Sequence, residues 1–459
     1  MSRIKTGKKN CSRSQTDQAP PTSTPPQPRF VGVDLHKQIA TFHTMAEDGK
    51  TLEQGRFDVN PEAILKFANE KLQAADSVAV EVTSNTWAFV RLIRSHVDKV
   101  VVSNPMKTKA IAEASVKTDK VDAKVLAHLL RCNYLPSVWT PTETIENSRA
   151  LAARRTALVG QRTALRNRIH SVLARRLVVV PAGGPFTQAG LTWLQELSLD
   201  PVDRTLIDTD LRLLEGIAQE MQEIEHLIVK ESYDDPDIRL LMTLPGLDFT
   251  IAQALKACLA DISRFPNPDK AASYLGLTPR IKQSAGKCYH GSITKAGSSQ
   301  TRWLLIQAAQ SVGRTPGPLG AFFRKLEKKK NRNIAVVATA RKLVTIAWHM
   351  LKNKEPYRYA VPRTTENKLG TLRVRATGEK RKGGSPKGPK PEPRFENSDS
   401  RRIPSLDEIY TREDVPGRRP LSEGEKRMIQ EAGVENFVAE LGQTRIVPRK
   451  KRVPASTAQ

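Results

Sequence analysis

The sequence predicts an α/β domain near the N-terminus, followed by mainly helical segments. Three observations support this fold class. Short apolar segments that suit strands alternate with amphipathic segments that suit helices between residues 29 and 140. Two long stretches with helical periodicity lie between residues 145 and 235. A further region rich in helix signals covers residues 236–358.

The chain is strongly basic. Of its 459 residues, 74 are Lys or Arg and 48 are Asp or Glu, which gives a formal net charge of +26. Such a charge attracts polyanions, of which nucleic acid is the commonest large one, although charge alone also suits a ribosomal-type or membrane-surface protein. The four cysteines are scattered without paired spacing, which predicts neither a disulfide framework nor a zinc site. Because the sequence shows no apolar signal segment and no run of membrane-spanning length, we expect a cytoplasmic protein without a membrane partner.

The expected domain boundaries follow changes in composition. The two ends of the chain are poor in apolar residues, so we expect disorder at both, with one short helix near residues 422–441. The predicted parts are a disordered extension (1–28), an α/β domain (29–140), a long-helix region (145–235), a compact, mainly helical domain (236–358) and a mostly disordered basic tail (359–459).

The α/β domain is expected to begin with three strands, in "RFVGVDL", "IATFHTMA" and "LEQGRFDV", with a turn at Asp48-Gly49. A helix opened by Pro61 follows, then a strand in "DSVAVEVT", a helix, a strand in "DKVVVSN" and a final helix. Three meandering strands followed by alternating helices and strands is the order of elements in ribonuclease-H-like domains. We therefore predict that fold, with a mixed sheet.

The long-helix region carries an apolar stripe that repeats every seven residues, at Leu151, Leu158, Leu165 and Val172. A second helix of the same kind follows "PAGGP", so a helical hairpin or a dimerising coiled coil is expected. The first helix is also rich in arginine, including Arg162, Arg166 and Arg168. Two roles stay open for it, a packed spacer and a nucleic-acid-binding element.

Four acidic residues stand out in the α/β domain. Asp34 interrupts the first apolar strand, and Glu81 interrupts the fourth. Asp119 and Asp122 are three residues apart and share one helix face. Each has a simple structural explanation: Asp34 could end its strand with a backbone hydrogen bond, and Asp119 could cap its helix with Asp122 in the first turn.

The four are harder to explain together. In a ribonuclease-H-like sheet, strands one and four are neighbours and the last helix packs across them, which would bring all four carboxylates to one place. Carboxylates that close repel each other unless hard cations neutralise them. Two Mg²⁺ ions about 4 Å apart are the usual solution in phosphodiester chemistry, and Mn²⁺ could replace them. We therefore predict that Asp34, Glu81, Asp119 and Asp122 are metal ligands.

The motifs "VGVDLHK", "AVEVT" and "KTDKVDAKVLA" resemble the DEDD RuvC-like domain of bacterial insertion-sequence transposases that carry a catalytic serine and are guided by a bridge RNA encoded in the element. Downstream, "LMTLPGLDFTIAQAL" resembles the helix-hairpin-helix start of their second domain, and "SAGKCYHGSITKAGSSQTRWLLIQAA" lies in a segment that resembles its core. The resemblance covers about residues 29–358, with two motif sets in the right order.

This resemblance implies a transposase that excises and inserts an insertion sequence. The family's nucleophile matches Ser284, which would form a covalent phosphoserine link with DNA, and Lys287, Lys295 and Arg302 would contact phosphates. It also implies a homodimer or homotetramer, double-stranded DNA as substrate and a guide RNA. The chain departs from the family pattern at Asp248, where a small residue is usual, and at Ser298, where Asn or Asp is usual.

Two other functions remain open. One is a RuvC-like, structure-selective endonuclease that cuts DNA with metal-activated water. The other is a non-catalytic, basic nucleic-acid-binding protein. From the residues alone, Ser284 is an ordinary loop serine with no base beside it in the sequence, and Lys295 and Arg302 are ordinary surface charges. A covalent protein–DNA adduct would separate the transposase from both alternatives.

Overall fold

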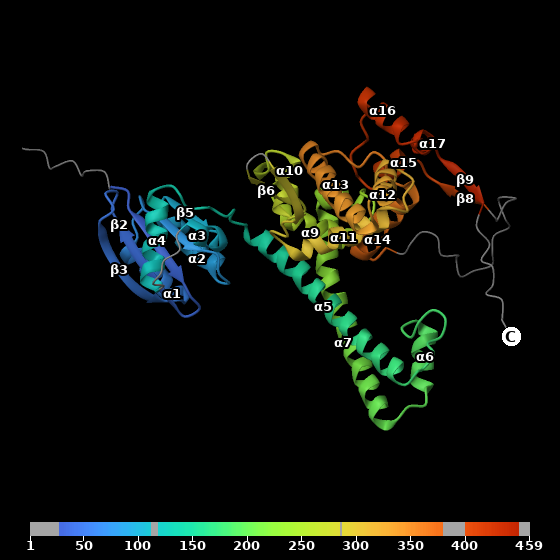
Figure 1. Cartoon of the computed structure of the whole chain (residues 1–459), viewed down its shortest axis with the longest axis horizontal. Helices are drawn as coiled ribbons and strands as arrows, with labels where there is room; N and C mark the ends of the chain where they lie inside the picture. The colour runs from blue at the N-terminus through green and yellow to red at the C-terminus, as the bar shows by residue number, and fades with distance from the viewer. Residues whose placement is uncertain (1–26, 112–117, 285–286, 380–399, 449–459) are drawn as a thin grey trace, which may run out of the picture. The chain divides into compact units, whose positions relative to one another are not determined.

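The computed structural model describes residues 27–111, 118–284, 287–379 and 400–448 (Figure 1). The chain divides into two compact units, an N-terminal unit that ends at Pro141 and a C-terminal unit that begins at Thr142. The predicted disorder of residues 1–28 lies almost wholly outside the described residues.

The N-terminal unit is built on a five-stranded mixed sheet with the strand order β3-β2-β1-β4-β5. Strands β1 to β3 form an antiparallel meander, while β4 runs parallel to both β1 and β5. The strands are β1 (Phe30–Leu35), β2 (Ile39–Met45), β3 (Thr51–Asp58), β4 (Ser77–Glu81) and β5 (Lys99–Ser103). The five predicted strands and the predicted pairing of the first with the fourth are confirmed.

Helices cover both faces of this sheet, and they are α1 (Pro61–Lys71), α2 (Thr86–Ile93), the short 3-10 helix η1 (Arg94–His96), α3 (Pro105–Ile111) and α4 (Asp119–Arg131). Residues of α1 and α2, including Phe67 and Phe89, share a core with Val31 and Val33 of β1. On the other face, Leu126 and Leu130 of α4 pack with Ala79 of β4 and Val101 of β5.

Gly32 shows how closely α4 lies on the sheet. A Cβ atom at this position would lie 2.0 Å from the carbonyl oxygen of Ala123 and 2.6 Å from the backbone nitrogen of Ala127. Only a residue without a side chain permits this approach. The helix is therefore held against β1 by backbone contact.

Two long helices open the C-terminal unit, α5 (Glu143–Arg175) and α7 (Pro201–Asp234), and they pack along each other (Figure 1). The predicted stripe is confirmed at Leu158 and Leu165, which are buried. Between the long helices lies α6 (Gln188–Glu196), which the sequence analysis did not predict. The pair forms a helical hairpin within one chain, and the dimerising coiled coil stays a prediction.

The body of the C-terminal unit is mainly helical, as predicted. Its helices are α8 (Pro236–Met242), α9 (Phe249–Leu259), the 3-10 helix η2 (Ile262–Arg264), α10 (Pro268–Tyr274), α11 (Ser299–Val312), α12 (Pro318–Lys329) and α13 (Arg332–Asn353). Among the described residues, α13 is the one helix long and apolar enough to cross a membrane, contrary to the expectation that no run has this length. Its apolar residues, such as Leu343 and Ala347, are buried in the core of the unit, which is typical of a core helix.

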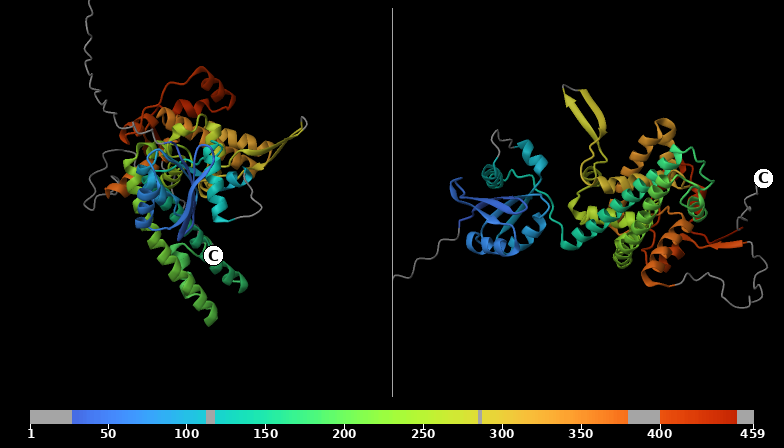
Figure 2. Two further views of the ribbon diagram at one scale, coloured as in Figure 1. Left: turned by 90° about the vertical axis from the view of Figure 1, so that its left-hand side faces the viewer. Right: turned by 90° about the horizontal axis from the view of Figure 1, so that it is seen from below.

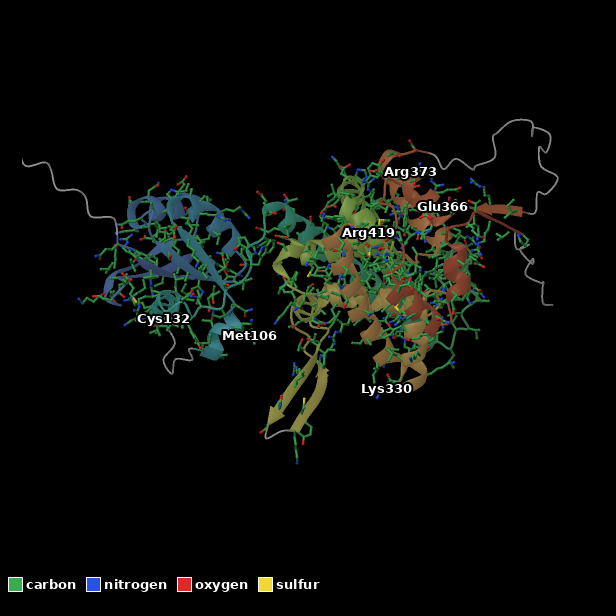
Figure 3. All side chains as sticks on the ribbon, turned by 90° about the horizontal axis from the view of Figure 1, so that it is seen from above. Met106, Cys132, Lys330, Glu366, Arg373 and Arg419 are labelled. Atoms are coloured by element: carbon green, nitrogen blue, oxygen red, sulfur yellow. The ribbon has the colours of Figure 1, made fainter. Side chains whose placement is uncertain are left out.

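A β-hairpin interrupts these helices where Ser284 was expected to lie in a loop. Strand β6 (Pro279–Ser284) pairs with β7 (Lys287–Ile293) in antiparallel register. The hairpin extends away from the helical body of its unit (Figure 2, Figure 3), and most of its described side chains are exposed, whereas Ile293 at its base packs against the core.

The expectation of a mostly disordered tail is wrong for the described residues after Tyr357. They form α14 (Pro362–Thr377), β8 (Ser400–Ile403), α15 (Leu406–Arg412), α16 (Glu423–Glu431), α17 (Glu435–Glu440) and β9 (Arg445–Pro448). Leu369, Leu406 and Tyr410 are buried in the main core, so a few well-spaced apolar residues anchor this charged segment. The expected helical structure near residues 422–441 is confirmed, although it consists of two helices, α16 and α17, rather than one.

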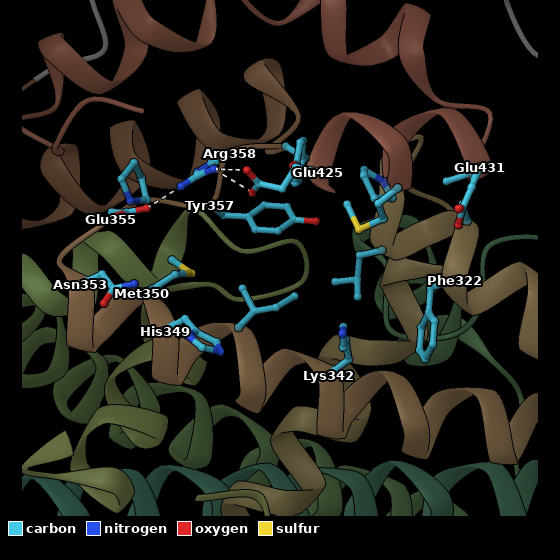
Figure 4. Close-up of a pocket in the computed structure, with 18 of the residues that line it drawn as sticks. Phe322, Lys342, His349, Met350, Asn353, Glu355, Tyr357, Arg358, Glu425 and Glu431 are labelled. Atoms are coloured by element: carbon cyan, nitrogen blue, oxygen red, sulfur yellow. Dashed lines mark hydrogen bonds and ion pairs between the residues drawn. The ribbon is translucent and has the colours of Figure 1, made fainter. Parts of the chain in front are cut away.

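Helix α16 also closes one side of a cavity with α12 and α13, lined by Phe322, His349 and Tyr357 among others (Figure 4). At its rim, the Arg358 guanidinium donates to the carboxylate of Glu425 on α16 at 2.6 Å and to that of Glu355 at 2.9 Å (Figure 4). Ion pairs and burial therefore attach the C-terminal segment to the body of the unit.

Candidate active site

The acidic residues of β1 and β4 lie at the same end of the sheet. Val33 is paired with Val80, and Asp34 and Glu81 are the next residues of these two parallel strands. Because side chains alternate along a strand, Asp34 lies on the face of Gly32, and Glu81 lies on the face of Ala79. Both Gly32 and Ala79 face α4. The strand register thus directs both carboxylates toward the side that α4 covers.

Helix α4 supplies the other two carboxylates from its first turn, at Asp119 and Asp122. The helix is capped by Thr118, whose hydroxyl oxygen accepts the Val121 N–H at 3.3 Å. The alternative that Asp119 serves as the N-cap is therefore wrong, and its carboxylate is available for another role. Burial raises the pKa of Asp34, and the nearby charges of Asp122 and Asp119 raise it further.

His36 belongs to the same cluster, and the sequence analysis missed it. Its Nε2 atom lies 3.2 Å from Oδ2 of Asp34 and 3.7 Å from Oδ1 of Asp119. The Asn85 side chain donates to the His36 carbonyl oxygen at 2.9 Å, which fixes the β1–β2 turn against the loop after β4. The spacing Asp-Leu-His in "VGVDLHK" could have indicated this neighbour.

The donor set fits a divalent cation. One ligand atom each from Asp34, His36 and Asp119 can be chosen so that all lie within 4.8 Å of one another. Carboxylate oxygens are the hard ligands that Mg²⁺ and Mn²⁺ prefer. Glu81 is placed beside Asp34 by strand register, and its strand end is fixed by the Thr86 hydroxyl, which donates to the Glu81 carbonyl oxygen at 2.7 Å. Of the four predicted acidic residues, Asp34 and Asp119 belong to this cluster, while Glu81 ends the strand beside Asp34 and Asp122 lies in the first turn of α4.

Ser284 lies in the C-terminal unit at the end of β6, where it is exposed and paired with Lys287. Lys287 is likewise exposed, in agreement with a phosphate contact. Lys295 lies in the segment after β7 with its backbone in the left-handed region, at φ 56°, and its side chain is exposed.

Arg302 does not have the predicted role. It is 9% exposed, and its guanidinium donates to the carbonyl oxygens of Leu275 at 3.1 Å and Ala296 at 2.8 Å. A guanidinium used in this way holds the segment after β7 against the turn after α10 rather than binding phosphate. The departure at Ser298 also has a local function, because its hydroxyl caps α11 by accepting the Thr301 N–H at 3.1 Å.

The arginines of α5 are largely engaged within the helical hairpin. Arg168 donates to Asp210 of α7, with Nε 3.1 Å from Oδ2. The guanidinium carbon of Arg166 lies 4.9 Å from the centre of the Phe186 ring. Arg162 is half-buried, beside Arg155 and Arg166. These contacts favour the spacer role for Arg166 and Arg168, while nucleic-acid binding by Arg162 stays a prediction.

Comparison with known proteins adds two family matches. Residues 31–176 match a family described as a DEDD transposase of the IS110 type, and residues 238–324 match the transposase family IS116/IS110/IS902. The matched segments include Asp34, Glu81, Asp119, Asp122 and Ser284.

Curated relatives agree with both matches. The chain is similar to the transposase for insertion sequence element IS1328 of Yersinia enterocolitica, with 25% identity over 70% of this chain and 96% of the relative. The transposase for insertion sequence element IS1111A of Coxiella burnetii is 24% identical over 72% of this chain and 91% of the relative. A pilin gene-inverting protein of Moraxella bovis is 24% identical over 72% of this chain and 97% of the relative. By these matches, the chain belongs to the IS110/IS116/IS902 family of transposases and is an enzyme of DNA transposition.

Proposed function

We propose that this transposase excises and inserts its insertion sequence through a covalent phosphoserine at Ser284, with divalent cations bound by Asp34, Glu81, Asp119 and Asp122. The observation that carries the proposal is the position of these four carboxylates at one end of the sheet face that α4 covers. An element-encoded RNA guides the reaction, and a homodimer or homotetramer performs it. The RNA and the assembly rest on the family resemblance.

The sheet supports a RuvC-like assignment of the N-terminal unit. An antiparallel meander of three strands followed by two parallel strands, in the order β3-β2-β1-β4-β5, is the arrangement expected of a ribonuclease-H-like domain. The close approach of α4 to Gly32 places the start of this helix beside the end of β1. This supports the proposal that the strand carboxylates of Asp34 and Glu81 act with the helix carboxylates of Asp119 and Asp122.

The acidic residues suit Mg²⁺, or Mn²⁺ in its place, because they offer several carboxylate oxygens close together. When bound, the ions would neutralise the carboxylates and polarise the oxygens of a DNA phosphate. His36 would orient Asp34, since its ring nitrogen lies within hydrogen-bonding distance of one carboxylate oxygen. Burial and the neighbouring carboxylates raise the pKa of Asp34, which agrees with a site where a bound cation would stabilise the charged carboxylate.

Serine chemistry suits a reaction that must cut and rejoin DNA. The Ser284 Oγ would attack phosphorus, so that a new P–O bond forms as the P–O bond to the neighbouring nucleoside breaks. The serine proton leaves, and the released DNA oxygen takes up a proton as a hydroxyl. Because one phosphate ester replaces another, rejoining needs no external energy source. The name of the Moraxella relative, a gene-inverting protein, supports such conservative exchange.

The test is strand exchange on DNA that carries the ends of the element, in Mg²⁺. Asp34→Asn or Glu81→Gln should abolish exchange while leaving the fold and nucleic-acid binding near wild type. Glu70→Gln is the matched control, since Glu70 is exposed on α1, which packs on the opposite face of the sheet. Wild-type exchange rates in the Asp34 or Glu81 variant would remove the metal site from the proposal. Efficient cutting that never leaves protein on the DNA would favour the endonuclease alternative.

A further inference from the structure

The hairpin that carries Ser284 exposes two large hydrophobic side chains. Tyr289 of β7 is 63% exposed and Ile281 of β6 is 59% exposed. A two-stranded hairpin is marginally stable by itself and is usually stabilised by packing against another surface. The hairpin extends from its own unit, so these side chains are open to a binding partner (Figure 2, Figure 3).

The pairing register sorts these residues onto two faces. Ser284 pairs with Lys287, and Lys282 pairs with Tyr289. Directly paired residues of an antiparallel ladder share a face, and so do residues two apart along one strand. One face therefore presents Ser284, Lys287, Lys282 and Tyr289 together, whereas Ile281 lies on the opposite face with Gln283 and Cys288.

The charge of the hairpin identifies the class of partner. Residues 279–293 contain Arg280, Lys282 and Lys287 and no Asp or Glu. Such a basic surface attracts a polyanion rather than a protein surface that carries both acidic and basic groups. Exposed aromatic rings beside cations are the usual means of holding unpaired nucleotides, because bases stack on the ring while the cations contact the phosphates.

We propose that the Ser284 face of the hairpin binds an unpaired DNA strand, with a base stacked on Tyr289 and flanking phosphates held by Lys282 and Lys287. The inference rests on the proposed function, because it assigns the strand to the phosphate that Ser284 attacks. The Lys282–Tyr289 pair is the next pair on the same face after the Ser284–Lys287 pair. A base stacked on Tyr289 would therefore fix the DNA strand near the serine hydroxyl. Tyr289 is thus a positioning residue.

The experiment uses the full chain with Ser284→Ala, so that no covalent link forms. The probe is a single-stranded oligodeoxynucleotide from the element end that carries one fluorescent base analogue. Stacking on Tyr289 should quench the analogue, and Tyr289→Ala should remove that quenching and weaken binding roughly tenfold or more. Tyr289→Phe should keep both, since the ring remains. Ile281→Ala is the matched control, because this residue is similarly exposed on the opposite face, and it should leave quenching unchanged.

Equal quenching by the protein that keeps Tyr289 and by the Tyr289→Ala variant would overturn the inference. Quenching that depends on Tyr289 with an RNA probe but not with the DNA probe would also overturn it. A separate assay of the covalent adduct, in protein that keeps Ser284, distinguishes the two proposals. If the adduct forms at the same rate with and without the Tyr289 ring, the stacking inference fails and the serine mechanism stands. If quenching depends on Tyr289 but no adduct forms, the strand contact stands and the serine mechanism fails.

Discussion

The two regions proposed to carry out the reaction are built in opposite ways. The carboxylates of the N-terminal unit lie on two central strands and on a helix in backbone contact with one of them. Ser284 lies on a hairpin that extends away from the helical body of its unit, and its own side chain is exposed (Figure 3). The difference teaches that the proposed metal site would be held in place by folding, whereas the proposed nucleophile would be placed by what it binds.

We expect the backbone contact at Gly32 to be the point of the N-terminal unit that is most sensitive to substitution. Gly32→Ala would place a methyl group 2.0 Å from the Ala123 carbonyl oxygen, so α4 must move away from β1. We expect the free energy of unfolding to fall by about 1–3 kcal/mol and strand exchange to be lost. Chemical denaturation and the exchange assay measure the two effects.

Gly160→Ala is the control, since a Cβ atom at Gly160 in α5 would have no atom within 4 Å. Alanine should stabilise that helix by roughly 0.5–1 kcal/mol. Wild-type stability and exchange in Gly32→Ala would show that α4 is not held by this contact.

Arg302 tests how much of the hairpin's surroundings is fixed by folding. Arg302→Ala leaves the carbonyl oxygens of Leu275 and Ala296 without their donor, which should destabilise the protein by about 1–3 kcal/mol. Thermal unfolding gives the stability, and the salt dependence of DNA binding should not change, because the residue is buried. Lys295→Ala should show the reverse pattern, with unchanged stability and a weaker salt dependence. A large change in the salt dependence of DNA binding for Arg302→Ala would instead support a phosphate contact by Arg302.

Lys368 of α14 tests whether the C-terminal segment is part of the fixed core. Its Nζ atom donates to the carbonyl oxygens of Leu244 at 2.7 Å and Leu247 at 2.9 Å, in the turn before α9. Burial lowers the pKa of Lys368 to about 7. Between this value and the usual pKa near 10.5, the unfolded chain binds a proton that the folded chain does not, so stability should rise with pH.

Lys368→Met should remove this rise, which thermal unfolding across pH 7 to about 10 can measure. Lys230→Met is the control, because Lys230 is exposed on α7 and its replacement should leave the pH dependence as it is. An unchanged pH dependence in Lys368→Met would mean that α14 does not hold the Lys368 side chain in the core.

The smallest effect is expected on the long helix α5. Arg168 is already neutralised by Asp210, whereas Arg162 lies beside two other arginines. Arg162→Ala should therefore reduce the slope of log binding constant against log salt by about one, and Arg168→Ala should leave it nearly unchanged. Equal slopes for the two variants, measured by titration with structured RNA, would contradict a binding role for Arg162.

The fixed region could be predicted from the sequence, and the exposed one could not. Asp34 and Glu81 break apolar strands, and Asp119 and Asp122 share a helix face, so periodicity marks them, and the predicted ribonuclease-H-like order of elements brings them together. Ser284 has no local pattern around it and was indicated only by the resemblance. The hairpin was missed because β6 and β7 are polar and exposed, without the apolar alternation that marks a packed strand.

Other misses have a similar cause. Arg302 was assigned to phosphate because a sequence does not show which arginines are buried with carbonyl partners. The C-terminal segment was assigned to disorder because its average composition is charged, although Leu406, Ile409 and Tyr410 are spaced to bury one face of α15. His36 was missed because it lies beyond the end of β1, although its position two residues after Asp34 could have indicated this contact.

The most direct test of the proposed serine chemistry is to locate the covalent bond between protein and DNA. Wild-type protein is allowed to react with labelled element-end DNA in Mg²⁺, digested with nuclease and protease, and examined by mass spectrometry for a peptide that carries a nucleotide. We expect the nucleotide on Ser284, and Ser284→Ala should yield no such peptide while still binding DNA. A nucleotide on Ser292, Ser298 or Ser299, or efficient cutting with no modified peptide, would contradict it.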